Sequence, residues 1–286
     1  MDTHLDFADL GLSPVALDLG FFTLKWYALS YLAAFVTGWL YLRRLVRLPG
    51  APIAEAHLGD LFSYVGFGVI VGGRIGYCLV YQPAIWLTPW RVLELWNGGM
   101  SFHGGLAGTL IAIWLFARAH NLDLLRVYDY VACATPFGLF LVRIANFVNG
   151  ELWGRPSSLP WAMIFPGAGD GIPRHPSPLY EAFLEGVLTM AVLAWMFWRT
   201  DARLRRGRLV GAGLLIYGVT RFLLEFTRQP DAGLEHLSWG LTMGQTLCLP
   251  MVAAGLWLLI CPPARAPAPA AASGSQPGSP RPGRAQ

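Results

Sequence analysis

Long apolar stretches separated by short polar segments run through most of the chain. Seven of them approach the roughly 20 residues that an α-helix needs to cross a bilayer. Because lipid offers no partners to exposed backbone groups, only helices are suited to such stretches. The pattern predicts an all-α polytopic membrane protein with about seven transmembrane helices, at residues 26–42, 61–81, 103–119, 128–148, 180–198, 209–227 and 241–260.

The composition agrees with a membrane protein. The 286 residues are 55% hydrophobic and only 13% charged, whereas charged residues make up roughly 25% of an ordinary soluble domain. The first twenty residues contain several aspartates and no basic segment, so we expect no cleavable signal peptide.

The basic residues predict the orientation of the helices. With seven spans, the connections alternate between the two sides of the membrane. One set of connections, together with the C-terminal tail, holds thirteen arginines, and the other set holds five basic residues. Positive residues favour the cytoplasmic side, so we expect the N-terminus outside and the C-terminus inside. The net charge of +4 is explained in this way without a nucleic acid partner.

The chain divides into a predicted transmembrane domain, residues 1–262, and a tail, residues 263–286. The tail consists mainly of Pro, Ala, Ser and Gly, which cannot bury enough apolar surface to fold, so we expect a disordered cytoplasmic segment. The longest connection between spans, residues 149–179, contains six prolines and lies on the predicted outer side. Long loops of this kind are often functional.

Motifs for metals and cofactors are missing from the sequence. The four cysteines, Cys78, Cys133, Cys248 and Cys261, lack the paired spacing of a metal site or a disulfide framework, and we expect small core residues. There is no Gly-rich phosphate loop and no G-x-S-x-G motif. We therefore expect neither a metal nor a cofactor.

Three arginines, Arg74, Arg143 and Arg221, lie within predicted spans. A charge at the bilayer centre costs at least about 2.5 kcal/mol, so each needs an explanation. In the predicted topology all three fall in the outer halves of their spans, and Tyr27 and His103 open other spans at the same depth. Polar groups from separate helices therefore converge, although Arg74, flanked by glycines, could equally be structural.

Helical spacing groups several of these residues. Arg143, Asn146 and Asn149 repeat every three residues, which places them along one helix face. Because Arg143 has no acid three or four residues away, a purely structural role would require a partner on another helix.

A second polar stripe consists of Tyr217, Arg221 and Glu225, which repeat every four residues. Here two interpretations stay open. Arg221 and Glu225 could form an ion pair that only neutralises two buried charges, or they could take part in a site.

Buried arginines of this kind favour an anionic ligand. The guanidinium fork matches phosphate, and a phospholipid head group is the most natural phosphate at this depth. These features are typical of a lipid transferase or of a transporter or flippase for an anionic lipid or solute, and a structural charge network is the third alternative. We find no internal repeat, which weakens the transporter.

Five segments resemble the bacterial prolipoprotein diacylglyceryl transferase family. They are RIANFVNGELWGRP (143–156), SFHGGLAG (101–108), RHPSPLYEAFLEG (174–186), YGVTRFLLEFTRQPD (217–231) and GLTMGQTLCLP (240–250). The family usually has glycine at Ala145, and the matches run in order from about Tyr27 to Pro250. The resemblance implies an inner-membrane enzyme that transfers the diacylglyceryl group of phosphatidylglycerol to the lipobox cysteine of a preprolipoprotein signal peptide, releasing glycerol phosphate.

The resemblance also implies site residues. Combined with the helical spacing, it predicts two overlapping sets. The catalytic set is His103, Arg143, Arg221, Glu225 and Tyr27, with His103 as the base that takes the thiol proton. The set that binds phosphatidylglycerol is Arg143, Asn146, Asn149, Glu151, Gly154, Tyr217 and Arg221.

The residues after the fourth span leave alternatives open. Glu151 could be a solvated loop carboxylate, or it could orient Arg143 or Arg155. Gly150 and Gly154 are expected to permit a backbone turn, because glycine tolerates positive φ.

Overall fold

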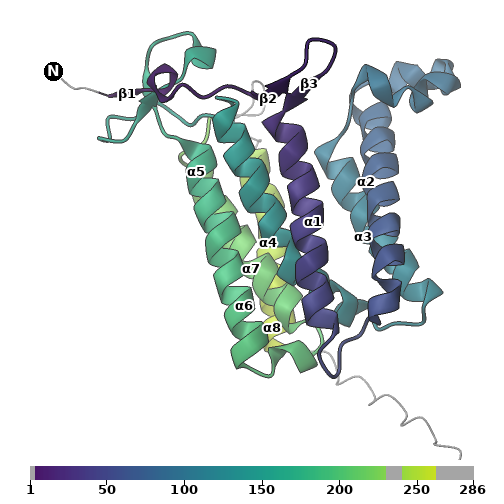
Figure 1. Cartoon of the computed structure of the whole chain (residues 1–286). Helices are drawn as coiled ribbons and strands as arrows, with labels where there is room; N and C mark the ends of the chain where they lie inside the picture. The colour runs from purple at the N-terminus through teal and green to yellow at the C-terminus, as the bar shows by residue number, and fades with distance from the viewer. Residues whose placement is uncertain (1–3, 230–239, 262–286) are drawn as a thin grey trace, which may run out of the picture.

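The protein is a bundle of helices that run between two ends of the molecule, with short strands at one end (Figure 1). The computed structural model describes residues 4–229 and 240–261; the predicted tail therefore lies outside the described residues. The helices are α1 (Trp26–Val46), α2 (Leu58–Val80), α3 (Phe102–Ala119), α4 (Leu124–Val148), α5 (Ser177–Glu181), α6 (Thr189–Arg199), α7 (Arg208–Leu224) and α8 (Met243–Ile260).

A π-helical segment, η7 (Ala182–Leu188), joins α5 to α6, so these three elements form one continuous helix. Each of the seven apolar stretches predicted from the sequence lies largely within helix, which confirms the helical part of the prediction. In the described part of the chain, five helices are long and apolar enough to cross a membrane: Glu55–Val80, Phe102–Ala119, Leu124–Val148, Ser177–Arg199 and Met243–Ile260.

The remaining two long helices fall short of that standard. α7 has 17 residues. α1 has 21 residues, but tyrosines and tryptophans interrupt its aliphatic run. The structure thus bears out a mostly helical membrane protein with five helices of spanning length and hydropathy.

Short strands form a cap at one end of the bundle, which the all-α prediction misses. β1 (Leu5–Asp6) pairs in parallel with β4 (Met163–Ile164), and β4 pairs antiparallel with β5 (Pro173–Arg174). β2 (Val15–Asp18) and β3 (Thr23–Lys25) form an antiparallel hairpin that leads directly into α1. These strands are too short to produce a periodic signal in the sequence.

The cap has a small core of its own, in which Phe7 packs against Phe165 and Phe147, with ring centroids 5.3 and 5.5 Å apart. This core ties the N-terminal segment to the Pro-rich loop that follows α4. The larger apolar core lies toward the opposite end of the bundle. Its largest fully buried side chains include Leu45, Leu58, Phe116, Tyr130 and Phe197.

Successive helices alternate in direction, so the C-terminal ends of α2, α4 and α7 lie beside the cap with the N-terminal ends of α1, α3, α5 and α8 (Figure 1). The more basic set of connections lies at the other end. There, Arg126 donates from Nη2 to the carbonyl of Gly50 at 2.7 Å and from Nη1 to that of Leu204 at 3.3 Å. Asp123 and Arg206 form an ion pair there, at 2.6 Å. The two sets of connections are thus separated as predicted.

Glycines bring α2 and α3 into close contact. A Cβ added to Gly108 would lie 2.0 Å from the carbonyl oxygen of Gly68, and one added to Gly72 would lie 2.4 Å from that of Gly104. The Gly104 and Gly108 spacing is the small-xxx-small pattern that lets helix backbones approach closely. Backbone atoms cannot yield as a flexible side chain can, so a larger residue here must separate the helices.

We expect Gly108→Ala to destabilise the protein by about 1–3 kcal/mol, the usual cost of overpacking. Thermal unfolding in detergent would measure the effect. Gly66→Ala on α2 is the matched control, because a Cβ there meets nothing within 4 Å, and alanine is the better helix former. Equal unfolding temperatures for the two variants would contradict the packing argument.

Candidate active site

Two of the predicted intramembrane arginines meet at one carboxylate. Nε of Arg143, on α4, lies 2.7 Å from Oε2 of Glu181 at the end of α5. Nη1 of Arg221, on α7, lies 2.9 Å from Oε1 of the same residue. Glu181 is only 1% exposed, so a single buried carboxylate holds guanidinium groups from two other helices. The partner that Arg143 lacks on its own helix is therefore on α5.

Further charges complete this arrangement. Nη2 of Arg221 lies 3.1 Å from Oε2 of Glu225, so the predicted i,i+4 pair forms. Arg228, just beyond α7, approaches Glu181 at 3.5 Å. Glu185 lies 3.6 Å from Nη2 of Arg143 and 3.8 Å from Nη1 of Arg221. We call these six residues the charge cluster: Arg143, Arg221, Arg228, Glu181, Glu185 and Glu225.

The charge cluster contains three arginines and three glutamates, so its formal charges cancel. Unpaired charges at this depth would be costly, and cancellation explains how the fold tolerates them. The cluster is nonetheless incompletely bonded, because neither carboxylate oxygen of Glu185 accepts a hydrogen bond from any described residue. Glu185 therefore acts on the arginines mainly through longer-range attraction.

The π-helical segment positions the two glutamates of the fifth helix. Glu181 ends α5, and Glu185 lies within η7. Gly186 lets this segment approach α4, since a Cβ there would lie 2.7 Å from the Cβ of Phe140 and 2.9 Å from its Cα. Phe140 is less than one turn before Arg143. The close approach thus sets the distance at which Arg143 meets its glutamates, and π-helical turns are frequent at functional sites.

The end of α4 carries a second polar group of residues. Nδ2 of Asn146 donates to Oε1 of Glu151 at 2.7 Å, and Nδ2 of Asn149 donates to the same oxygen at 3.1 Å. Glu151 is half-buried, so the solvated-carboxylate interpretation is wrong, and the described contacts pair it with asparagines rather than with Arg143 or Arg155. The Oδ1 atoms of both asparagines are buried and have no partner among the described residues, which leaves two acceptors for a ligand.

The two glycines of this segment serve different purposes. Gly150 has φ of 65°, so the predicted left-handed turn is confirmed there. Gly154 does not have positive φ, and the expectation is wrong for it. Its constraint is steric, because a Cβ would lie 2.3 Å from both Oγ of Ser177 and the carbonyl of Thr227. Gly154 lets the loop after α4 pack between the start of α5 and the end of α7.

The remaining predicted residues lie at the same end of the bundle but make fewer contacts. Oη of Tyr27, at the start of α1, lies 3.2 Å from Oη of Tyr31. Tyr217 precedes Arg221 by one turn of α7. His103, at the start of α3, is exposed, and its ring packs on Phe102 at 5.5 Å. No contact between described residues joins His103 to the charge cluster.

Arg74 is structural, the alternative that its flanking glycines left open. It is buried, and its guanidinium donates to the backbone carbonyls of Arg91 at 2.6 Å, Val92 at 2.8 Å and Gly98 at 2.6 Å. These bonds fasten the connection between α2 and α3 to the body of α2. Their number and short length account for this buried charge without a ligand.

Sequence reasoning missed Glu181, Glu185 and Arg228. The two glutamates lie four residues apart inside an apolar stretch, and an acid within a span is as unusual as an arginine. The two glutamates could have been found from charge neutrality, because arginines inside the spans require carboxylate partners. Arg228 follows the predicted span 209–227, so the sequence places it in a connection.

His175 lies just before α5, at the same end of the bundle, although it is not among the predicted site residues. Its Nδ1 lies 3.3 Å from Oη of Tyr180, and Tyr180 accepts a hydrogen bond of 2.7 Å from Trp161. Burial lowers the pKa of His175, which favours the neutral imidazole.

A pocket of about 200 Å³ opens beside the charge cluster, lined by Arg155, Glu225, Phe226, Gly240, Leu241, Thr242 and Gln245.

Comparison with known proteins decides the family. A family model described as prolipoprotein diacylglyceryl transferase matches residues 14–261. The chain belongs to this family. The resemblance carried by the five sequence segments is thereby confirmed, and the protein is a transferase.

Curated relatives of this transferase carry the same name, phosphatidylglycerol–prolipoprotein diacylglyceryl transferase. The protein from Zymomonas mobilis is 51% identical over 269 residues, which cover 91% of this chain and 94% of the relative. The protein from Erythrobacter litoralis is 49% identical, covering 88% of this chain and 90% of the relative. The protein from Rhodospirillum centenum is also 49% identical, with 91% and 96% covered.

We expect Glu181→Ala to destabilise this transferase by about 3–5 kcal/mol, the cost of breaking a buried ion pair by removing one partner. In the variant, Arg143, Arg221 and Arg228 would all lose the carboxylate of Glu181 as an ion-pair partner. Thermal unfolding in detergent would measure the loss. Glu55→Ala is the control, because Glu55 also pairs with two arginines, at 2.7 Å each, but on the exposed surface. A loss no larger than that of the control would show that burial does not determine the energetics of the cluster.

Proposed function

We propose that this transferase moves the diacylglyceryl group of phosphatidylglycerol to the thiol of a lipobox cysteine in a preprolipoprotein signal peptide. A bond forms between the cysteine sulfur and the terminal glycerol carbon of the diacylglyceryl group. The bond from that carbon to the phosphate oxygen breaks, and glycerol phosphate leaves with the electron pair. The relatives' names and the family match support this reaction. The observation that carries it is the pair of partly buried guanidinium groups of Arg143 and Arg221 at one buried carboxylate.

Arg143 and Arg221 are the proposed phosphate ligands. When the carbon–oxygen bond breaks, the phosphate gains negative charge, and preorganised donors in a low-dielectric site stabilise such charge best. The carboxylates of Glu181 and Glu225 hold the guanidinium planes before a lipid enters. The arginines therefore need little reorganisation during the reaction.

The asparagines are proposed to bind the glycerol head group. The free Oδ1 atoms of Asn146 and Asn149 can accept hydrogen bonds from its hydroxyl groups, while Glu151 fixes both side-chain amides. Gly154 has a positioning role, because it lets the following loop pack closely behind this group. Tyr217 would add a hydroxyl near Arg221.

The thiol must lose a proton, because the thiolate is the real nucleophile. We propose His103 as the base, with Tyr27 at the same end of the bundle to help orient the peptide. The exposure of His103 is compatible with this role only if the peptide, and not the charge cluster, is its partner. Transfer needs no cofactor in this scheme.

The proposed setting is a bacterial inner membrane, with seven spans, the N-terminus outside and the C-terminus inside. The active site then opens toward the outer leaflet, where the cap lies. This orientation is supported by the gathering of basic residues, including Arg126 and Arg206, at the opposite end of the bundle. Residues 1–262 form the catalytic domain in this proposal.

The direct test mixes purified protein, phosphatidylglycerol labelled in its acyl chains and a lipobox peptide, and follows the label by mass spectrometry. We expect a peptide that carries a thioether-linked diacylglyceryl group, with equimolar glycerol phosphate. A peptide with serine in place of the cysteine is the control. Intact protein that moves labelled lipid between leaflets of a vesicle but yields no product would instead indicate a lipid transporter.

Arg143→Ala should reduce transfer by at least about 100-fold, as does the loss of one preorganised donor to a developing oxyanion. Initial rates at several lipid concentrations would measure the change. Arg118→Ala is the matched control, because Arg118 lies in the last turn of α3, at the end of the bundle away from the charge cluster. This variant should keep normal turnover. If Arg143→Ala also kept it, Arg143 would have no place in the site.

His103→Gln should lower transfer by about 10²–10⁴-fold, which is the usual contribution of a positioned general base. Initial rates at saturating peptide would measure the effect. Supplying a peptide thiol of lower pKa should partly rescue the variant, because less help with deprotonation is then needed. A full rate in the variant would assign the proton to another group or to water.

A further inference from the structure

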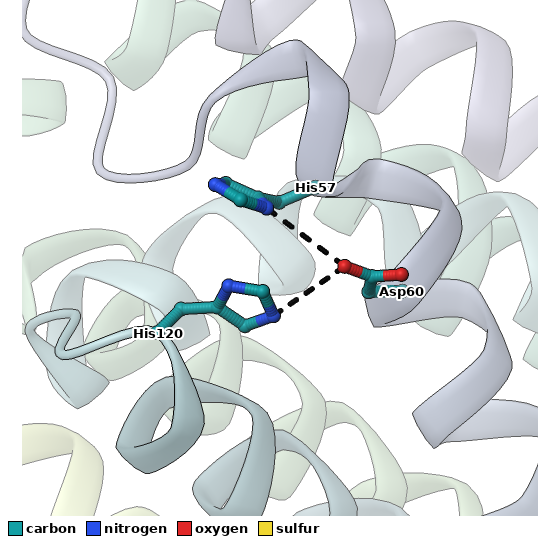
Figure 2. Close-up of side chains that lie close together, drawn as sticks. All are labelled: His57, Asp60 and His120. Carbon is teal, nitrogen blue, oxygen red and sulfur yellow. Dashed lines mark ion pairs between the residues drawn. The ribbon is translucent and has the colours of Figure 1, made fainter.

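A second group of chemically reactive side chains lies at the end of the bundle opposite the charge cluster. His57 immediately precedes α2, Asp60 lies in the first turn of α2, and His120 follows the last residue of α3. Figure 2 shows both imidazole rings directed at the same carboxylate. Nδ1 of His57 lies 3.8 Å from Oδ2 of Asp60, and Nε2 of His120 lies 3.5 Å from the same oxygen. The proposed transfer reaction uses none of these residues.

We propose that His57, Asp60 and His120 form a binding site for a divalent metal ion of the zinc type. Two imidazoles and one carboxylate are a recurrent ligand set for such ions, with a water molecule in the remaining position. One ligand atom from each residue lies within 4.8 Å of the others. This is the one such group among the described residues.

The distances suit a metal better than they suit direct hydrogen bonds. Nitrogen-to-oxygen hydrogen bonds in proteins are typically about 2.7–3.2 Å long, shorter than either contact to Asp60. Ligand atoms around a tetrahedral zinc ion, at about 2.0–2.1 Å from it, lie about 3.4 Å from one another. The observed 3.5 and 3.8 Å are near that spacing. Only small side-chain rotations are therefore needed to enclose an ion.

The fold holds these residues in place. The His120 backbone amide donates to the carbonyl of Phe116 at 3.1 Å, and its ring packs on that of Phe116 at 4.6 Å. The rings of His57 and His120 lie 4.3 Å apart. The glycine contact between α2 and α3 fixes the two helix ends side by side. His120 thus provides a rigid ligand, while the more exposed His57 and Asp60 can adjust.

A bound ion would join the start of α2 to the end of α3. In the proposed topology this is the cytoplasmic end, away from the lipid site. The expected consequence is stabilisation of the α2–α3 pair, since a ligand that binds only the folded state raises its apparent stability. The proposal does not depend on the transfer reaction.

Zinc titration of the full chain in detergent, purified without a polyhistidine tag and monitored with a competing zinc-binding dye, would test the site. We expect one tightly bound equivalent, and a rise of the unfolding temperature with zinc. Asp60→Asn should weaken binding by more than about 10-fold, because even loss of an outer-shell partner costs 10–100-fold. The double variant His57→Gln, His120→Gln should lose the equivalent. His4→Gln is the control and should bind as the unmodified chain does.

Cobalt would provide an independent readout, since a tetrahedral cobalt ion gives strong visible absorption that an octahedral aqueous ion lacks. The double variant should keep normal transferase activity, which shows that it is folded. Zinc bound with unchanged affinity by this active variant would overturn the proposal. So would a wild-type protein that binds no stoichiometric zinc at concentrations up to about 100-fold above the protein concentration.

Discussion

The attraction between partly buried guanidinium groups and buried carboxylates is the constraint on which the arrangement of the cap end of the bundle depends. Arg143, Arg221 and Arg228 come from two parts of the chain, and Glu181 touches all three. Removing any one charge leaves another uncompensated where water is scarce, so the helices that carry them must stay together. Gly186 permits η7 to pack closely on α4, and this packing keeps Glu181 and Glu185 within reach of Arg143.

This constraint connects stability with chemistry. A guanidinium that is already held by carboxylates has a fixed orientation, and fixed donors stabilise developing charge better than mobile ones. The same pairing limits how strongly the site attracts anions in its resting state, because the formal charges cancel. The large apolar core is at the other end of the bundle, around Leu45 and Tyr130. The site is thus separated from the largest apolar core of the bundle.

Much of this could be predicted from the sequence, for identifiable reasons. The helices follow from apolar runs, and the convergence of Arg143 and Arg221 follows from alternating helix direction. The β cap could not be predicted, because strands such as Leu5–Asp6 are set by distant partners and not by local periodicity. The role of Glu181 could not be predicted from the sequence, because it depends on the distance between α5 and the helices that carry Arg143 and Arg221. The grouping of His57 with His120 could not be predicted from the sequence either, because only the contact between α2 and α3 brings the two residues together.

In the proposed site Arg143 both balances a buried acid and binds the phosphate. A charge exchange separates these roles, combining Arg143→Glu with Glu181→Arg. The decisive measurement is the transfer rate of this double variant, at a temperature where it is folded, relative to the two single variants and the unmodified protein. We expect the double variant to regain much of the thermal stability that each single variant loses, while transfer stays at least about 100-fold below normal. Recovery of transfer together with stability would contradict this expectation, because the cluster would then be structural only.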